Sequence, residues 1–286
     1  MSDETRYIIK LILMASVAGM VLAQALSVPM SELAGVFRQR MLLVRAFVAV
    51  YVLVPLATLL VILLVKPARN VEIGLAMLAA APIAPMMIVR IPRAGGQMAQ
   101  VVALHFAMTL ISLVVTPLIL QLMGSILGFK ADVDVLQLVA LLAPVLLLPV
   151  GCGVAIRRLW PRFAARLIGP LAKVSWLLVL AGIIAILAMS YQTLFQTSPR
   201  SFIAMGAVVT IALAIGHVLA SLVPEERVTL AMITAARHPG VVLMIAAANF
   251  SRAQAIPVLI PYLIVLLVIT TIYMKWNKVE KLDRRD

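Results

Sequence analysis

Long apolar blocks alternate with short polar connections along the whole chain. Blocks at residues 48–65, 136–150 and 256–273 contain no charged residue. Each reaches or nearly reaches the length of about 20 residues that a helix rising 1.5 Å per residue needs to cross a bilayer. A soluble protein would require one helix after another without a polar face. The pattern therefore predicts an all-α polytopic membrane protein.

We count nine apolar segments, with connections too short to fold as a separate soluble domain. They cover residues 7–26, 41–65, 72–89, 96–122, 133–156, 164–191, 201–223, 227–248 and 254–276. The first segment follows the acidic residues Asp3 and Glu4 and runs past signal-peptide length, so we interpret it as a retained span. We expect residues 1–286 to form a single membrane domain with a basic tail at residues 277–286.

The basic residues are divided unequally between the two sides of this nine-span arrangement. If the C-terminus lies inside, 16 Lys and Arg residues fall on the inner side and 7 on the outer side, with Arg237 counted on neither. An even number of spans would remove this asymmetry. We therefore expect a protein of the bacterial inner membrane, with its C-terminus in the cytoplasm and its N-terminus outside.

Composition also argues against several other classes of function. The net charge of +13 lies in the connections and not in a basic stripe with interleaved aromatic residues, so we expect no nucleic-acid partner. The chain has no HExxH motif, no paired carboxylates within the spans and no phosphate-binding glycine loop, so we expect no enzyme and no cofactor. The single cysteine, Cys152, excludes an intrachain disulfide and a cysteine-based metal site, and we expect it to be a small packing residue.

Two of the predicted spans are interrupted near their middle. The third contains Pro82 and Pro85, and the eighth contains Pro239 followed by Gly240. Proline removes a backbone donor and clashes with the carbonyl four residues before it, so each site is predicted to kink or unwind. Such breaks are tolerated in a bilayer only against protein or beside a cavity, and a pair of them in two halves of a chain is typical of transporter binding sites. The alternative is that prolines are simply common in membrane helices.

The two halves also follow a similar order, which predicts an inverted repeat. Each break is followed by a long helix that contains Thr116 in the first half and Thr270 in the second, 154 residues apart. The two units, residues 72–124 and 225–276, would end on opposite sides of the membrane.

Residues 78–120 and 229–250 resemble the bile acid:sodium symporter family. The resemblance lies in the first broken helix, in a following helix that reaches Val115-Thr116-Pro117-Leu118, similar to a Leu-Thr-Pro-Leu sequence, and in the second broken helix near the C-terminus. It implies a core domain with two crossed broken helices, a panel domain that rocks against it, and alternating-access transport of organic anions. Members that lack an extra first helix have nine spans.

The chain departs from the sodium-coupled members of that family at the residues that bind sodium. Positions that carry Glu, Gln and Asn in those members correspond here to Ile233, Arg237 and His238; polar positions after the first break correspond to Met86, Met87 and Ile88; and positions in the next helix correspond to Val101, His105 and Met108. Sodium needs several hard oxygen ligands, which apolar side chains do not supply, and arginine supplies only donors. We therefore expect no coupling to sodium, with the Arg237 guanidinium in place of the cation and either proton-coupled or uncoupled transport.

The candidate site residues follow from this comparison. Arg237 is expected to bind a carboxylate or sulfonate, or to replace the cation, the alternative being that it reaches the membrane interface. His238 and His105 are candidate proton carriers or packing residues. Around them we place Pro239, Met86 and Met87, with Arg90 at the inner mouth or serving only as an orientation signal.

The sequence thus favours a secondary active or facilitative transporter of a small organic anion. The alternative is a membrane sensor or accessory protein that kept the transporter fold but no longer transports.

Overall fold

The computed structural model describes residues 3–27, 35, 38–84, 87–129, 135–249 and 256–283, and every regular element in them is a helix. The sequence-based prediction of an all-α fold is confirmed. In chain order the elements are α1 (Asp3–Ser27), α3 (Arg40–Phe47), a π-helical turn (Val48–Leu53), α4 (Val54–Val65), α5 (Arg69–Ala80), α6 (Met87–Arg93), α7 (Met98–Leu127), α8 (Val135–Leu159), α9 (Pro161–Gln196), α10 (Pro199–Leu219), α11 (Pro224–Ala235), α12 (Pro239–Asn249) and α13 (Ile256–Asp283).

Four of the described helices are long and apolar enough to cross a membrane. They are Arg40–Val65, Gln100–Leu127, Pro199–Leu219 and Val258–Asn277. Large apolar side chains project outward from them, including Leu64, which is 73% exposed, Leu118 and Leu122. Such outward-facing apolar surface is what a helix in contact with lipid presents.

Both predicted interruptions are present in the structure. The third predicted segment is divided into α5 and α6, and the eighth into α11 and α12. The second predicted segment, in contrast, continues from α3 through the π-helical turn into α4. Another difference is that α9 has 36 residues and therefore extends beyond the predicted 164–191 at both ends.

Prolines and residues with positive φ explain several of the helix boundaries. Four helices (α9, α10, α11 and α12) begin at a proline, whose fixed φ suits the first helical position. Helix α7 ends at Gly128, whose φ of 66° lies in the left-handed region favoured at helix C-termini. Helix α4 ends at Lys66, which adopts a φ of 49° directly before Pro67.

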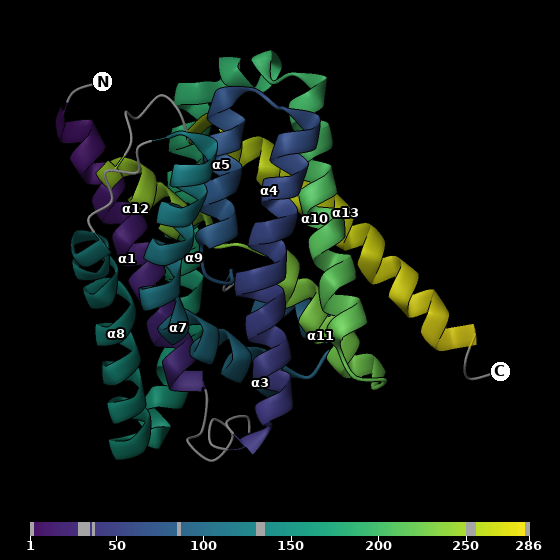
Figure 1. The fold of residues 1–286 in the computed structure, drawn as a ribbon. Coiled ribbons are helices and arrows are strands. Elements are labelled where there is room, and N and C mark those ends of the chain that lie inside the picture. The colour runs from purple at the N-terminus through teal and green to yellow at the C-terminus, as the bar shows by residue number, and fades with distance from the viewer. Residues whose placement is uncertain are drawn as a thin grey trace.

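The helices pack in two groups (Figure 1). Helix α1 packs mainly against α8 and α9, whereas α10 packs against α11, α4 and α13, and α5 packs against α4, α7 and α13. Glycines allow close approach within both groups: Gly19 of α1 lies against Ser175 of α9, and Gly216 of α10 lies against the backbone of α11. The two groups meet where α1 contacts α12 and where α7 contacts α8.

The two broken helices form the centre of the second group. Side chains are buried along α5 from Ile73 to the break and along α11 from Val228 to its end, and burial continues through the unwound segment to His238. A helix that is buried on every side has no amphipathic face, which agrees with the continuous apolar sequence of these segments.

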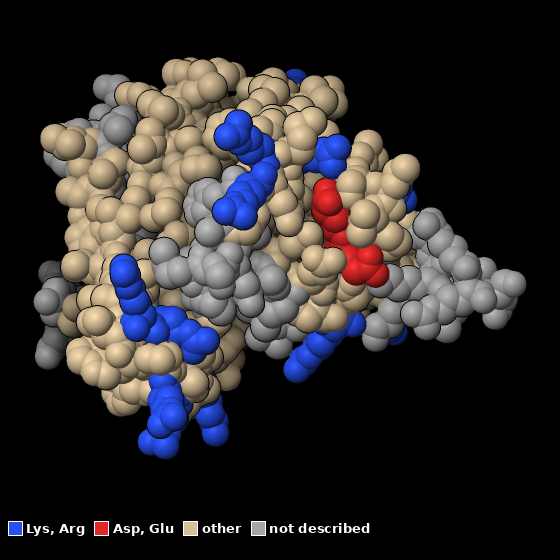
Figure 2. Space-filling model, turned by 90° about the horizontal axis from the view of Figure 1, so that it is seen from below, with Lys and Arg blue, Asp and Glu red and all other residues tan. Residues whose placement is uncertain are grey.

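Basic side chains gather at one end of the molecule. Figure 2 views that end, the lower one in Figure 1, where α3 begins and where the α8–α9 and α10–α11 connections lie. Nearly all the charged side chains visible there are Lys or Arg, with one small acidic patch. The N-terminus lies toward the opposite end from the C-terminus (Figure 1).

The environment of Cys152 differs from our expectation. Its side chain is a free thiol exposed on α8 and is not a packing residue. The neighbouring residue Gly153 is the one that packs, since it is buried against Ala25 of α1.

Candidate functional site

The first break unwinds the chain after α5. Ala81 has an extended ψ of 150°, and the chain passes through Pro82 and Ile83 in non-helical conformation. The carbonyl of Ala80 at the end of α5 accepts a hydrogen bond of 2.7 Å from the Thr116 hydroxyl of α7. A buried carbonyl that has lost its helical partner is thus satisfied by a neighbouring helix.

The second break occurs where a proline removes a backbone donor. Pro239 begins α12 and offers no N–H to the carbonyl of Ala235, four residues before it. The Tyr262 hydroxyl of α13 donates to that carbonyl at 3.2 Å. Gly240 follows the break, and a methyl group there would lie 2.7 Å from Cγ2 of Val17, so the glycine lets α1 approach α12 closely.

The two breaks are hydrogen-bonded to each other. The amide of Ala84 donates to the carbonyl of Ala236 at 3.1 Å, and the amide of His238 donates to the carbonyl of Pro82 at 2.8 Å. These bonds form a short antiparallel bridge between the two unwound segments. Segments more than 150 residues apart in sequence therefore cross, and each uses backbone groups that the other has freed.

Arg237 lies at this crossing and is almost completely buried, with an exposed fraction of 1%. Its Nη1 donates to the carbonyl of Ala81 at 3.3 Å, and its Nη2 donates to the carbonyl of Val50 at 2.9 Å. The guanidinium therefore ties the first break and the α3–α4 helix to the second break. Its Nε has no hydrogen-bond partner among the described residues.

Proline also explains why the Val50 carbonyl is free to accept. In the π-helical turn the amide of Val54 donates to Ala49, five residues before it. The same spacing would pair Val50 with residue 55, which is Pro55 and has no N–H. Likewise, the carbonyl of Ala81 lies four residues before Pro85. The sequence thus places a proline, which has no N–H, where a helical donor to each of these two carbonyls would otherwise stand.

The stretches of sequence that form the crossing contain no acidic residue to neutralise this buried charge. The 11 acidic residues lie near the predicted segment ends, and none occurs between residues 73 and 131 or between residues 227 and 279. Carbonyl oxygens stabilise the guanidinium through their dipoles but leave its full positive charge at the crossing. A buried site with this charge favours an anion.

Several buried polar groups of the second break and of α7 have no partner among the described residues. They are both ring nitrogens of His238, Nδ1 of His105 and the hydroxyl of Thr109. His105 and Thr109 lie on one face of α7, and His105 is within electrostatic range of His238. Unpaired buried polar atoms are uncommon and are the atoms that a ligand or water would satisfy.

The structure brings together some of the predicted site residues and separates others. Arg237, His238, Pro239 and His105 lie at or beside the crossing. Arg90 is half-buried on α6, and its Nη2 contacts Thr271 and Met274 of α13 and not the crossing. Met86 lies outside the described residues, and Met87 begins α6 with a side chain that is also outside them.

Three further residues at the crossing were not predicted from the sequence. Val50 contributes a carbonyl, Tyr262 donates to the second break, and the Tyr51 hydroxyl donates to the carbonyl of Met108 on α7 at 2.6 Å. Pro55 was the available signal for Val50, because a proline within an apolar span marks a carbonyl without a donor. Nothing in the local sequence distinguishes the two tyrosines.

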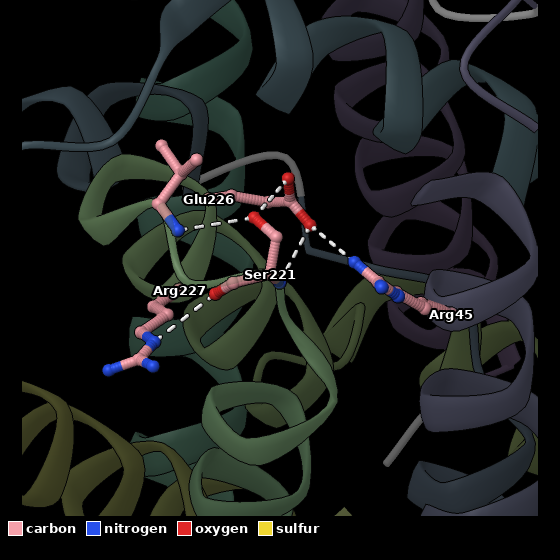
Figure 3. A network of polar contacts seen from close by, with 5 residues as sticks. Arg45, Ser221, Glu226 and Arg227 are labelled. Atoms are coloured by element: carbon pink, nitrogen blue, oxygen red, sulfur yellow. Dashed lines mark hydrogen bonds and ion pairs between the residues drawn. The ribbon is translucent and has the colours of Figure 1, made fainter. Parts of the chain in front are cut away.

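A second polar network lies where α11 begins (Figure 3). The Glu226 carboxylate accepts from the Ser221 hydroxyl at 2.7 Å and from the Arg45 guanidinium of α3 at 3.3 Å. Arg227 Nε donates to the carbonyl of Ser221 at 3.2 Å. The α3–α4 helix is therefore attached to the second broken helix at two levels, by this ion pair and by Arg237.

Comparison with known proteins gives the chain a family. A sequence model described as the Sodium Bile acid symporter family matches residues 12–197, well over half of the chain. The match includes the first break and ends before α11. No curated protein matched the chain. The chain belongs to the sodium bile acid symporter family, and is thus an integral membrane protein of a transporter family.

Proposed function

We propose that this protein carries a small organic anion across the bacterial inner membrane by alternating access, without coupling to sodium. Family membership supports transport itself. The position of Arg237 supports the absence of sodium coupling and is the observation on which the proposal depends.

Two hydrogen bonds carry that argument. The carbonyls of Ala81 and Val50 are hard oxygen ligands of the kind that sodium requires, and both are bound to Arg237. A guanidinium presents N–H groups toward these oxygens and remains charged at every accessible pH. It therefore holds the crossing together in the way that a bound cation would, while excluding one.

The anionic character of the substrate follows from the charge and the unpaired groups at the crossing. Arg237 supplies a positive charge without a carboxylate partner, and His238, His105 and Thr109 supply donors and acceptors that have no partner within the described chain. We assign these groups to the polar end of the substrate. Pro239, Met86 and Met87 would line the same site, and Arg90 would act at the inner mouth.

The division of the helices suggests which parts move. We assign α1, α8 and α9 to the panel domain, and the two broken-helix units at residues 72–124 and 225–276 to the core. Gly240 packs against Val17 where the two groups meet, so the candidate site lies on the surface along which they would slide. Nine spans, with the N-terminus outside and the basic tail inside, agree with termini toward opposite ends and with basic residues gathered at one end (Figures 1 and 2).

The test is flux through purified protein in liposomes. Carboxylated and sulfonated ligands are first screened for thermal stabilisation across pH 5–8, and the ligands that bind are then assayed for uptake in sodium and in choline buffer. We expect saturable uptake that is the same in both buffers. Uptake that requires sodium would contradict the assigned role of Arg237, and stabilisation without flux would indicate the sensor or accessory function instead.

A further inference from the structure

The Arg237 cation differs from a bound sodium ion in one respect: it cannot leave with the substrate. We propose that the protein is an electrogenic uniporter, in which each monovalent anion crosses the membrane as one uncompensated negative charge. In a cell with a negative interior, the membrane potential then drives the anion outward. This inference rests on the proposed function, because it concerns the charge balance of the same site.

The positive charge of Arg237 stays at the crossing throughout the transport cycle. Arg237 is held by carbonyls from two other parts of the chain, Val50 in the π-helical turn and Ala81 in the first break. The Val50 carbonyl has no competing helical donor, because Pro55 occupies the position from which one would come, and the Ala81 carbonyl lies where the chain has already left the helical conformation. The guanidinium thus remains in place whether or not the substrate is bound.

No other ion accompanies the anion across the membrane. Besides Arg237, the titratable groups around the crossing are His105, His238, Tyr51 and Tyr262. A proton on either imidazole would add a second positive charge close to the guanidinium in a medium of low dielectric constant, where like charges repel strongly. No acidic residue that could compensate it occurs between residues 73 and 131 or between residues 227 and 279.

The fixed guanidinium and the lack of an accompanying ion determine the charge balance of one transport cycle. With a monovalent anion bound, the crossing holds one positive and one negative charge and is neutral. Empty, it carries one positive charge. One cycle therefore transfers one negative charge with the substrate, and a potential of 100 mV corresponds to about a 50-fold ratio of anion concentrations at equilibrium.

The experiment uses the wild-type protein in sodium-free liposomes, with taurocholate and benzenesulfonate as probes. Both probes carry one sulfonate charge at every pH used, so a change of pH does not alter the charge of the probe. Valinomycin and potassium gradients set the potential to about 100 mV of either sign, and protein-free liposomes correct for leak. We expect an inside-positive potential to drive accumulation of the transported probe toward about 50-fold, and an inside-negative potential to suppress uptake.

The possible outcomes separate this inference from the proposed function. A probe flux that ignores the potential but follows a pH gradient would indicate proton symport and overturn the inference, while leaving sodium-independent transport intact. A flux that ignores both gradients would overturn it equally. If neither probe crosses, and no ligand retained by the thermal screen crosses, the proposed function fails and this inference with it. As a direct check, addition of probe to protein adsorbed on a solid-supported membrane should give a transient current with the sign of anion entry.

Discussion

The two helix breaks arise from the same residue type and exchange one backbone hydrogen bond in each direction, but they differ in charge. The first break, between α5 and α6, carries no charge and presents the acceptors, namely the carbonyls of Ala81 and Pro82. The second break supplies the charged donor, the guanidinium of Arg237. The crossing is therefore asymmetric, although both breaks were formed by proline.

In the proposed function, this difference lets a side chain take the place of a bound cation. An acceptor-rich break needs a cation, and the cation can be either a soluble ion or a side chain from the opposite break. Charge-assisted hydrogen bonds are roughly twice as strong as neutral ones, so a guanidinium is an effective replacement. We therefore expect transport to depend on the charge at the second break, and on the backbone conformation at the first.

Replacement of Arg237 by Gln should have the largest effect. The variant removes the cation but keeps a polar side chain, and it leaves the carbonyls of Val50 and Ala81 without their charged donor. We expect transport to fall more than 100-fold, because bonds to charged groups contribute about 1.5–3 kcal/mol each. Expression and membrane insertion should persist, as measured by yield and by size-exclusion profile.

The matched control is Arg166→Gln, which removes an exposed arginine of α9. We expect wild-type flux from this control. Wild-type flux in Arg237→Gln as well would remove Arg237 from the mechanism, and sodium-stimulated flux in that variant would show that the side chain had displaced a sodium ion.

The next effect should come from Pro55→Ala, which restores a backbone donor in the π-helical turn. The new N–H competes with Arg237 for the Val50 carbonyl, or allows the turn to revert to an α-helix. We expect about a 5-fold loss of flux with unchanged or higher thermal stability, because proline within a helix is unfavourable. Pro170→Ala in α9 is the control and should leave flux unchanged. Equal flux in both variants would mean that the Val50 carbonyl does not need to be free.

The sequence predicted the breaks because proline acts locally. Pro82 and Pro239 lie at the two interruptions, which were found where they were expected, whereas Pro117 and Pro170 lie within continuous helices. The all-α fold followed equally directly from apolar blocks of membrane-spanning length. The burial of Arg237 could also be predicted from the sequence, because a charged residue in mid-span must face the protein interior.

The partners of these residues depend on tertiary structure and could not be predicted. The carbonyl that accepts from Arg237 belongs to Val50, 187 residues away, and a backbone acceptor has no side-chain signature. The separation of Arg90 from the crossing has a similar origin, since the α6–α13 contact that holds it is set by helix packing. The exposed Cys152 shows that a small residue in an apolar block can face outward from the protein.

A smaller effect is expected from the neutral hydrogen bonds that complete each break. Thr116→Val removes the donor to the Ala80 carbonyl, and Tyr262→Phe removes the donor to the Ala235 carbonyl. Each leaves a buried carbonyl unpaired, at a cost of about 1–3 kcal/mol. We expect both variants to melt a few degrees below wild type, with flux reduced no more than about 3-fold.

Thr270→Val is the matched control for Thr116→Val. In the predicted inverted repeat Thr270 corresponds to Thr116, but its hydroxyl donates within its own helix, to the carbonyl of Leu266 at 2.6 Å. It should therefore melt as wild type. A loss in Thr270→Val equal to that in Thr116→Val would show that the two threonines have the same role and that the asymmetry of the breaks is smaller than the geometry indicates.

The smallest effect should follow from breaking the ion pair between Glu226, in the first turn of α11, and Arg45. Glu226→Gln keeps an oxygen for Ser221 but loses the charge that attracts Arg45, whose side chain is 33% exposed. Partly exposed pairs contribute about 0.2–1 kcal/mol and weaken as salt is added. A double-mutant cycle of Glu226→Gln with Arg45→Gln, read by thermal melting at low and high salt, should give a coupling in this range that declines with ionic strength. A tenfold loss of flux in either single variant would contradict the comparison, because the second break would then depend on a charge outside the crossing as much as on Arg237.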